Sequence, residues 1–309
     1  MRLFRDTHYR FMKHRRLALA IALSILVGAW IAEFIRGGLN LGIDFAGGTQ
    51  LTLKFEQEPE LDRLRRALAD AGLAQAQIQR FGETEDNEVL IKTPILEGSE
   101  EGSRALVTAA LAGVGDYTVL ATGNVGPQVG AELRRKGILA VVFSMLGMLA
   151  YIWIRFELRF GIGALVATAH DVLITLALFA LTRYEFNLTT VAAFLTLIGY
   201  SVNDTVVLFD RVRENMRRSR RQSFEEIVDL ATNQTLSRTV LTSGTTLLAT
   251  GSLLVFGGDV LRGFAFILTI GIIVGTFSSV YIASPFALWW ERVFGKGARA
   301  ERKERKAAL

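Results

Sequence analysis

The sequence predicts a polytopic α-helical membrane protein with six transmembrane helices and an α+β domain between the first and second of them. Half of the 309 residues are hydrophobic, which makes a soluble class improbable. Six apolar runs are each roughly 18 residues or longer, enough to cross a hydrocarbon core of about 30 Å. Between the first and second runs, about a hundred residues have ordinary soluble composition, which indicates a separate domain.

The predicted spans follow the apolar runs in chain order. They cover residues 17–35, 137–154, 160–181, 188–209, 239–256 and 263–289. The first span follows a basic segment, as a signal peptide does, but its apolar run is longer than a usual signal-peptide core, so we interpret it as an uncleaved anchor. In the last span, Gly271, Gly275 and Ser279 recur at four-residue intervals and predict close helix packing.

Basic residues predict the orientation. They cluster before the first span, after the fourth and after the sixth. Because lysine and arginine are retained on the cytoplasmic side, both termini are expected there. The short cluster "RRK" at 134–136 is the exception. The expected units are 1–36 (basic cytoplasmic start and first helix), 37–134 (extracytoplasmic domain), 135–290 (five helices, with a basic cytoplasmic loop near 210–238) and 291–309 (basic cytoplasmic tail).

Charge and composition exclude several functions. The net charge of +5 is explained by the basic cytoplasmic segments, so no nucleic-acid partner is expected, and contact of these segments with anionic lipid or ribosomal RNA is left open. The absence of cysteine excludes thiol catalysis and cysteine metal sites. No Walker-type ATP-binding motif is present. We therefore expect no cofactor, no metal and no enzymatic activity, and energy supplied by an ion gradient or a partner.

The domain between the first two spans shows alternating strand and helix patterns. Residues 49–56 alternate as a half-buried strand does, and a helix with one apolar face follows, preceded by Pro59 and closed by Gly72. Two strands at 76–82 and 87–93, joined by the polar turn 83–86, a helix at 101–112 and a strand at 117–123 complete the pattern. The order β-α-β-β-α-β predicts a ferredoxin-like fold.

Glycine-rich segments flank this domain, "LGIDFAGG" at 41–48 and "GNVGPQVGAEL" at 123–133. Glycine adopts backbone angles that other residues avoid, so the flanks are either hinges to the membrane part or ordinary turns. Asp44 either caps a turn or pairs with a basic group. The candidate hinge residues are Gly42, Asp44, Phe45, Gly47, Gly48, Gly126, Pro127 and Gly130.

Charged residues within the spans are the candidate functional residues. An aspartate at the centre of a transmembrane helix costs about 2.5–3.5 kcal/mol, and two are present, Asp204 beside Asn203 in the fourth span and Asp171 beside His170 in the third. Arg238 lies at the cytoplasmic entrance of the fifth span. We interpret Asp204 and Asp171 as parts of a proton or cation pathway, with Arg238 acting on Asp204. Snorkelling of the arginine and an ion pair that only fixes helix register are the structural alternatives.

Threonines follow the arginine at helical spacing. Thr242, Thr245 and Thr246 extend a polar seam along the fifth span. Serine and threonine often form hydrogen bonds between packed membrane helices, so helix packing competes with a role in ion coupling for these residues.

Several motifs together resemble one family. They are "GIDFAGG" at 42–48, "GPQVGAEL" at 126–133, "AHD" at 169–171, "IGYSVNDTVVLFDRVREN" at 198–215 and "SRTVLTSGTTL" at 237–247. With one span before the outer domain and five after it, the chain resembles the SecF family over nearly its whole length. SecF proteins are the smaller membrane subunits of the bacterial SecDF protein-export complex, within the RND superfamily.

The resemblance implies a subunit in the bacterial cytoplasmic membrane that pairs with SecD, associates with the SecYEG channel and uses protons, or sodium ions in some bacteria, to promote translocation of unfolded polypeptides. By motif match, Asp204 and Arg238 fall where the family's essential transmembrane aspartate and arginine lie. Two other functions stay open: a small-molecule exporter of the RND type, and a scaffolding subunit without ion coupling.

Overall fold

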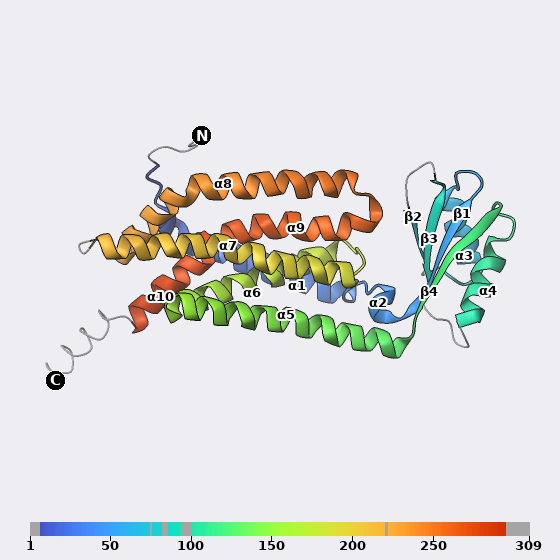
Figure 1. Cartoon of the computed structure of the whole chain (residues 1–309), viewed down its shortest axis with the longest axis horizontal. Helices are drawn as coiled ribbons and strands as arrows, with labels where there is room; N and C mark the ends of the chain where they lie inside the picture. Colours follow the sequence, from blue (N-terminus) through green and yellow to red (C-terminus); the bar gives the residue numbers. More distant parts are fainter. Residues whose placement is uncertain (1–6, 75, 82–85, 94–99, 220–221, 295–309) are drawn as a thin grey trace.

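The computed structural model describes residues 7–74, 76–81, 86–93, 100–219 and 222–294. Within these ranges, six helical segments are long and apolar enough to cross a membrane, as predicted. They form an elongated bundle with the strands at one end (Figure 1). The segments are α1 (Arg15–Arg36, preceded by the 3-10 turn Phe11–His14), α5 (Pro127–Arg155), α6 (Leu158–Leu181), α7 (Leu188–Arg218), α8 (Phe224–Phe256), and α9 (Gly258–Ser278) continued by a π-helical turn (Ser279–Ala283) and α10 (Ser284–Phe294).

Local sequence signals set where these helices begin. Asn187 accepts a hydrogen bond from the backbone N–H of Thr190 and forms a capping box at the start of α7. Ser223 and Glu226 form the same motif at the start of α8. Pro127, which has no backbone N–H to leave unsatisfied, occupies the first turn of α5.

The predicted basic loop near 210–238 is mostly helical. α7 continues to Arg218 and α8 already begins at Phe224, so a short connection at 219–223 joins them. Hydropathy detects the part of a helix that is apolar, and the charged ends of α7 and α8 project beyond that part. Arg220 and Arg221, the predicted turn at 83–85 and the basic ends 1–6 and 295–309 lie outside the described residues.

Four strands form one antiparallel sheet between α1 and α5 in the chain. They are β1 (Gly48–Phe55), β2 (Gln77–Phe81), β3 (Glu88–Thr93) and β4 (Tyr117–Val125), in the spatial order β2-β3-β1-β4. Helix α3 (Leu61–Asp70) follows β1 and α4 (Glu100–Leu111) follows β3, so the order of elements along the chain is the predicted one. Inward side chains of the strands and both helices bury one apolar core, including Leu51, Leu53, Leu64, Leu68, Ile91, Val107 and Leu111.

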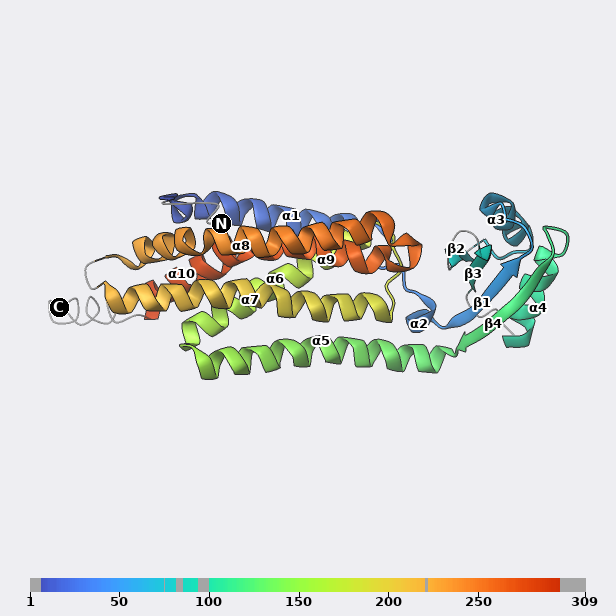
Figure 2. The same ribbon diagram turned by 45° about the horizontal axis from the view of Figure 1, so that its top comes forward.

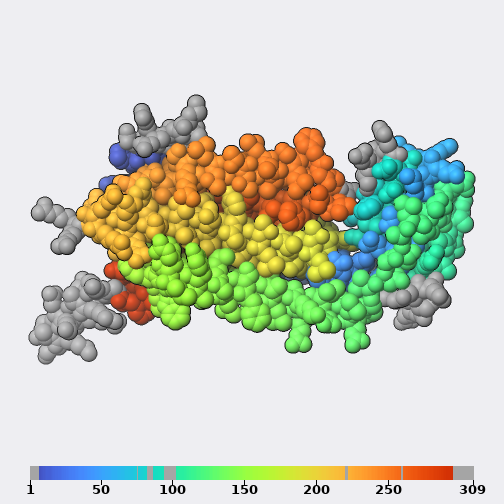
Figure 3. Space-filling model, viewed as in Figure 1, coloured from blue at the N-terminus to red at the C-terminus, as the bar shows by residue number. Residues whose placement is uncertain are grey.

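Helices α3 and α4 lie on the side of the sheet that faces away from the bundle (Figures 1 and 2). The other side of the sheet faces the ends of the membrane helices across a polar cavity of about 540 Å³. In the space-filling view, α5 runs along one edge of the bundle and reaches the sheet (Figure 3). Two chain segments thus connect the two parts, α1 through α2 (Ile43–Ala46) into β1, and β4 into α5.

The glycine-rich flanks of the sheet pack against each other. Gly47 has φ +80°, a backbone conformation that residues with a side chain rarely adopt. A Cβ on Gly48 would lie 2.6 Å from the carbonyl oxygen of Thr93, and a Cβ on Gly130 would lie 3.0 Å from that of Phe45. These glycines therefore permit close approach of the backbone in a packed junction. Whether the junction also acts as a hinge stays a prediction.

Polar contacts fasten this junction to α7. The backbone N–H of Leu188 donates to the carboxylate of Asp44 at 3.0 Å, so Asp44 acts as a capping group at the start of a distant helix, which differs from both the turn cap and the basic partner that the sequence offered. Lys92 of β3 pairs with Glu185, which precedes α7, at 2.5 Å, and their side chains are only 12% and 8% exposed.

We predict that Gly48→Ala destabilises the protein more than Gly126→Ala does. The added methyl group at 48 meets backbone and side-chain atoms at 2.6 Å, whereas a Cβ at 126 has nothing within 4 Å. Overpacking of this kind costs about 1–3 kcal/mol. Thermal unfolding of the purified protein in detergent should therefore show a lower Tm for Gly48→Ala and a near-normal Tm for Gly126→Ala. Equal Tm values for the two variants would contradict the packed junction.

Candidate functional site: a buried polar layer

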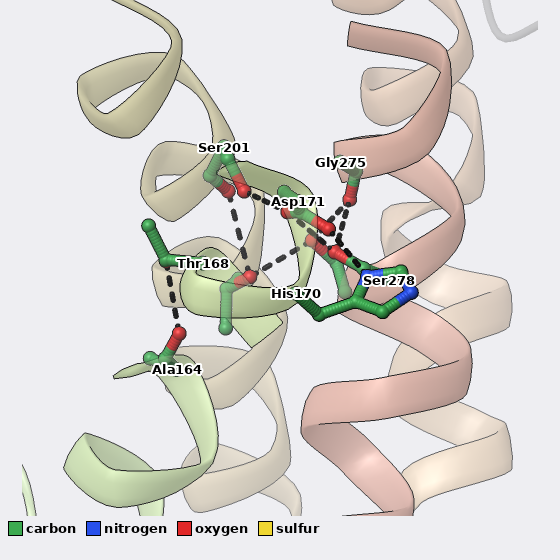
Figure 4. Close-up of polar contacts among 9 residues, drawn as sticks. Ala164, Thr168, His170, Asp171, Ser201, Gly275 and Ser278 are labelled. Carbon is green, nitrogen blue, oxygen red and sulfur yellow. Dashed lines mark hydrogen bonds and ion pairs between the residues drawn. The ribbon is translucent and has the colours of Figure 1, made fainter. Parts of the chain in front are cut away.

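Asp171 lies at the middle of α6 and is completely buried. The hydroxyls of Ser201 on α7 and Ser278 at the end of α9 donate hydrogen bonds to its Oδ2 at 2.5 and 2.7 Å (Figure 4). His170 Nδ1 lies 3.0 Å from its Oδ1. Three helices thus supply polar partners to one carboxylate inside an apolar bundle, where a buried charge needs hydrogen-bond donors.

Close packing of α9 makes this cluster possible. A Cβ on Gly275 would lie 3.2 Å from Ser201 and 3.5 Å from Asp171, and a Cβ on Gly271 would overlap Leu197. The prediction that these glycines permit close helix approach is therefore confirmed. Directly after Ser278 the chain forms the π-helical turn, a feature that is frequent at functional sites.

Asp204 lies on α7, less than one turn beyond Ser201, and is 7% exposed. Ser243 of α8 lies 3.4 Å from Asp204 Oδ2 and shares a 2.8 Å hydrogen bond with Thr276 of α9. Thr205 of α7 shares another 2.8 Å hydrogen bond with Ser279. The two predicted carboxylates therefore belong to one polar layer that crosses α6, α7, α8 and α9.

Arg238 makes no ion pair or hydrogen bond with Asp204 in the part of the chain that the structure describes. Its side chain is exposed on α8, and its positive charge acts on Asp204 only through space. Asn203, the neighbour of Asp204, is likewise exposed on α7. The sequence predicted both as members of the ion-coupling site, and the structure places them beside the buried layer rather than in it.

The three predicted threonines separate into two groups. The hydroxyls of Thr242 and Thr245 donate to backbone carbonyls of their own helix, and neither is hydrogen-bonded to another helix in the described part of the chain. Thr246 also receives a hydrogen bond from the Tyr200 hydroxyl of α7 at 3.2 Å. Among these threonines, only Thr246 thus shows the interhelical packing that the sequence offered as an alternative.

The glycine-motif residues form a separate site, at the junction with the sheet described above. Phe45 is buried there and its ring lies 5.6 Å from that of Phe186. The motif therefore lies where the sheet joins the helices, while the polar layer lies within the bundle.

The composition of the layer limits its chemistry. It offers carboxylate, hydroxyl and imidazole groups, which can exchange a proton or provide oxygen ligands to a small cation. In the described ranges, no three His, Asp or Glu side chains are grouped so that they could hold a metal ion.

Sequence reasoning missed the hydroxyl residues of the layer. Ser201, Thr205, Ser243, Thr276 and Ser278 were not predicted as site residues, and Ser279 was interpreted only as a packing residue. A signal was present, because Ser201 lies three residues before Asp204 and 276–279 contains three hydroxyl residues in an apolar span. Single serines are common in membrane helices, so their partners emerge only when the helices are placed together.

Comparisons with known proteins agree on one family. The family model "Protein export membrane protein SecD/SecF, C-terminal" matches residues 106–293, and "SecD/SecF GG Motif" matches residues 35–59. Protein translocase subunit SecF of Desulfurispirillum indicum is 44% identical over 290 residues, covering 91% of this chain and 91% of that protein. SecF of Gemmatimonas aurantiaca is 40% identical over 299 residues, covering 94% and 90%.

Solved structures agree as well. The crystal structure of SecDF from Thermus thermophilus, described as a translocon-associated membrane protein, has a TM-score of 0.79 and 40% identity. The match covers 93% of this chain and 39% of that chain. A second structure, SecDF in a super-membrane-facing form, has a TM-score of 0.73 and 39% identity, covering 99% and 40%. This chain therefore spans about two fifths of the solved SecDF chains.

We predict that Ser201→Ala and Ser278→Ala each destabilise the protein by about 1–3 kcal/mol, because each removes a donor from a buried carboxylate. Both hydroxyls donate to Asp171 Oδ2, so the double variant should depart from additivity. Ser252→Ala is the matched control, since its hydroxyl is exposed and donates to Leu248 of its own helix. Denaturation in nanodiscs gives the free energy of unfolding of the two single variants, the double variant and the control. If the stability losses of the two single variants added up in the double variant, the idea that both hydroxyls share one acceptor would be contradicted. A stability loss in the control as large as in the single variants would contradict it as well.

Proposed function

The chain belongs to the SecF family of protein translocase subunits, and we propose that it acts with SecD as an ion-driven accessory unit for protein translocation. In this proposal, protons or sodium ions entering through the membrane part promote the movement of unfolded polypeptide through the SecYEG channel. The observation that carries the proposal is the buried layer in which α6 and α7 supply Asp171 and Asp204, and hydroxyl groups of α7, α8, α9 and the π-helical turn surround them.

The energetics of the membrane support a functional reason for this layer. Each aspartate near the middle of the bilayer costs about 2.5–3.5 kcal/mol on insertion scales, and two are retained. One charge that moves across the membrane gains about 2.3 kcal/mol per 100 mV. A carboxylate that binds and releases an ion within the bundle converts that energy into a change in the contacts of α7, α8 and α9.

An exposed polar face supports the pairing with SecD. Asn203 on α7 and Arg238, Thr245 and Ser252 on α8 point out of the bundle at membrane depth. Polar groups that face hydrocarbon are unfavourable, so a second set of helices should cover this face. SecD is the proposed cover, since the solved SecDF chains are much longer than this one.

The arrangement of charges supports the proposed topology. The larger described clusters of basic residues belong to helix ends opposite the sheet, and the cluster at 134–136 near the start of α5 remains the exception; the larger clusters are Arg10, Lys13, Arg15, Arg16, Arg211, Arg213, Arg217, Arg218 and Arg292. Under the positive-inside rule this end is cytoplasmic, in the inner membrane of a bacterium. The sheet with its two helices is then an extracytoplasmic domain at about 37–134, for which we propose the ferredoxin-like fold.

Helix α7 offers a direct route from the layer to the outer domain. It carries Ser201 and Asp204 in its middle, and its first residue, Leu188, is bound by Asp44 of the glycine motif. A shift of α7 when an ion binds would therefore act on α2 and on β1, which follows it. An ion shifts this equilibrium only by its difference in affinity for the two states.

We predict that Asp204→Asn abolishes ion-coupled stimulation of translocation while leaving membrane insertion and assembly with SecD intact. The amide keeps the shape of the side chain but cannot bind and release a proton. Proton flux and translocation are measured in vesicles that contain SecD, SecYEG and this chain. Both signals should fall to the level of vesicles that lack the chain.

Asp210→Asn is the control, because Asp210 is an exposed aspartate on the same helix. It should retain full flux and translocation. Retained stimulation in Asp204→Asn would instead favour a scaffolding subunit without ion coupling.

A further inference from the structure

Glu33 is a buried carboxylate for which the proposed function has no role so far. It lies on α1, only 3% exposed, and both of its carboxyl oxygens are buried without a hydrogen-bond partner in the part of the chain that the structure describes. A carboxylate in apolar surroundings without a partner is strongly unfavourable, so the site requires a proton, a water or an ion.

The buried face of α1 directs this side chain toward the bundle. Ala18, Ala22, Ala29 and Glu33 are the buried residues of α1, and their spacing of four and seven residues places them on one side of the helix. Helix α1 packs against α6. Small alanines allow the two helices to approach, and Glu33 is the one ionisable member of that described face.

The ends of the two helices give the depth of Glu33. The side chain of Arg36 donates to the carbonyl of Leu181 at 3.3 Å, so α1 and α6 end at the same level on the side of the sheet. With a rise of about 1.5 Å per residue, Glu33 lies about 5 Å below that level and Asp171 about 15 Å below it. About 10 Å therefore separates the two carboxylates along the bundle axis.

Of two further buried polar atoms without partners, one lies at intermediate depth and the other lies beside Asp171. Thr175 is one helical turn from Asp171 toward the sheet end, and its Oγ1 has no partner among the described residues. The Nε2 atom of His170 is also buried without a partner there, while its Nδ1 contacts Asp171. Buried water molecules typically satisfy such orphaned groups, each water using two to four polar partners. The orphaned Thr175 hydroxyl thus marks a place for water between Glu33 and Asp171, and the His170 nitrogen marks one beside Asp171.

We propose that Glu33 is the outer proton acceptor of the Asp171 cluster. A proton from the extracytoplasmic solution binds to the Glu33 carboxylate, passes along water beside Thr175 and binds to Asp171, which leaves Glu33 ionised again. No other group is consumed or changed. This role rests on the proposed ion coupling and adds a named entry site to it.

The charged groups around this route are few. From α6 they are His170 and Asp171 near the middle and Arg159 at the cytoplasmic end. Arg36 lies at the end of α1, Arg183 and Glu185 lie in the connection after α6, and Glu185 is neutralised by Lys92. The 3-10 turn before α1 contributes Lys13 and His14, and the π-helical turn contributes Tyr281, all at the opposite end. Arg36 is therefore the closest cation along α1 itself.

The test uses dicyclohexylcarbodiimide, which modifies protonated carboxyl groups in apolar surroundings, on the full chain with SecD in sealed vesicles. Mass spectrometry should find the modification on Glu33. The extent of modification should decrease strongly when only the extracytoplasmic solution is made alkaline. It should stay constant when only the cytoplasmic solution is made alkaline. Glu33 left unmodified, or modified in response to the cytoplasmic solution, would overturn the proposal.

Flux measurements provide the second readout. Glu33→Gln should lower the proton flux roughly tenfold or more, as expected when a proton-transfer group is lost. Glu33→Asp should restore part of it. Glu132→Gln, an exposed glutamate on α5, is the control and should leave it unchanged. Unchanged flux in Glu33→Gln would overturn the proposal. The labelling does not depend on translocation, so it still decides the role of Glu33 if Asp204→Asn shows that ion coupling itself is absent.

Discussion

Two carboxylates within an apolar bundle need polar partners that lipid cannot supply, and this constraint governs the packing of the membrane part. Asp171 obtains its partners from α6, α7 and α9, and Asp204 obtains its nearest partner from α8. Gly271 and Gly275 let α9 lie against α7, which brings the hydroxyls of Thr276 and Ser278 into this layer. The small residues and the ionisable residues of these helices therefore belong to one arrangement, in which close contact between helices replaces solvation.

The same constraint explains why the bundle is uneven. α6 and α7 are the most buried of the six membrane segments, whereas α5 and α8 are mostly exposed in the described chain. A central pair of helices holds the carboxylates, and the exposed faces of the peripheral helices are available to contact lipid or another subunit. The exposed side chain of Arg238 belongs to this second category, so its effect on Asp204 depends on how a covering subunit changes the surroundings of both groups.

Much of the fold could be predicted from the sequence because its signals are local. Apolar length locates six spans, and alternating patterns locate the strands and helices of the outer part. The charged extensions of α7 and α8 were missed, since hydropathy does not detect helix outside the membrane. For the site, residue type identified Asp171 and Asp204 because a buried charge is rare. Ser201, Ser243 and Ser278 could not be identified in this way, since their role depends on which helix lies opposite. Glu33 was passed over because one acidic residue near the end of a span resembles an ordinary interfacial residue.

The pair formed by Lys92 and Glu185 has a consequence for how the outer part is held. Salt screens charges that are exposed to solvent, but it acts much less on a pair that is almost enclosed by protein. The attachment of β3 to the segment before α7 should therefore keep its strength when the ionic strength of the surrounding solution rises or falls. Changes in salt concentration then leave the sheet held against the helices by this contact.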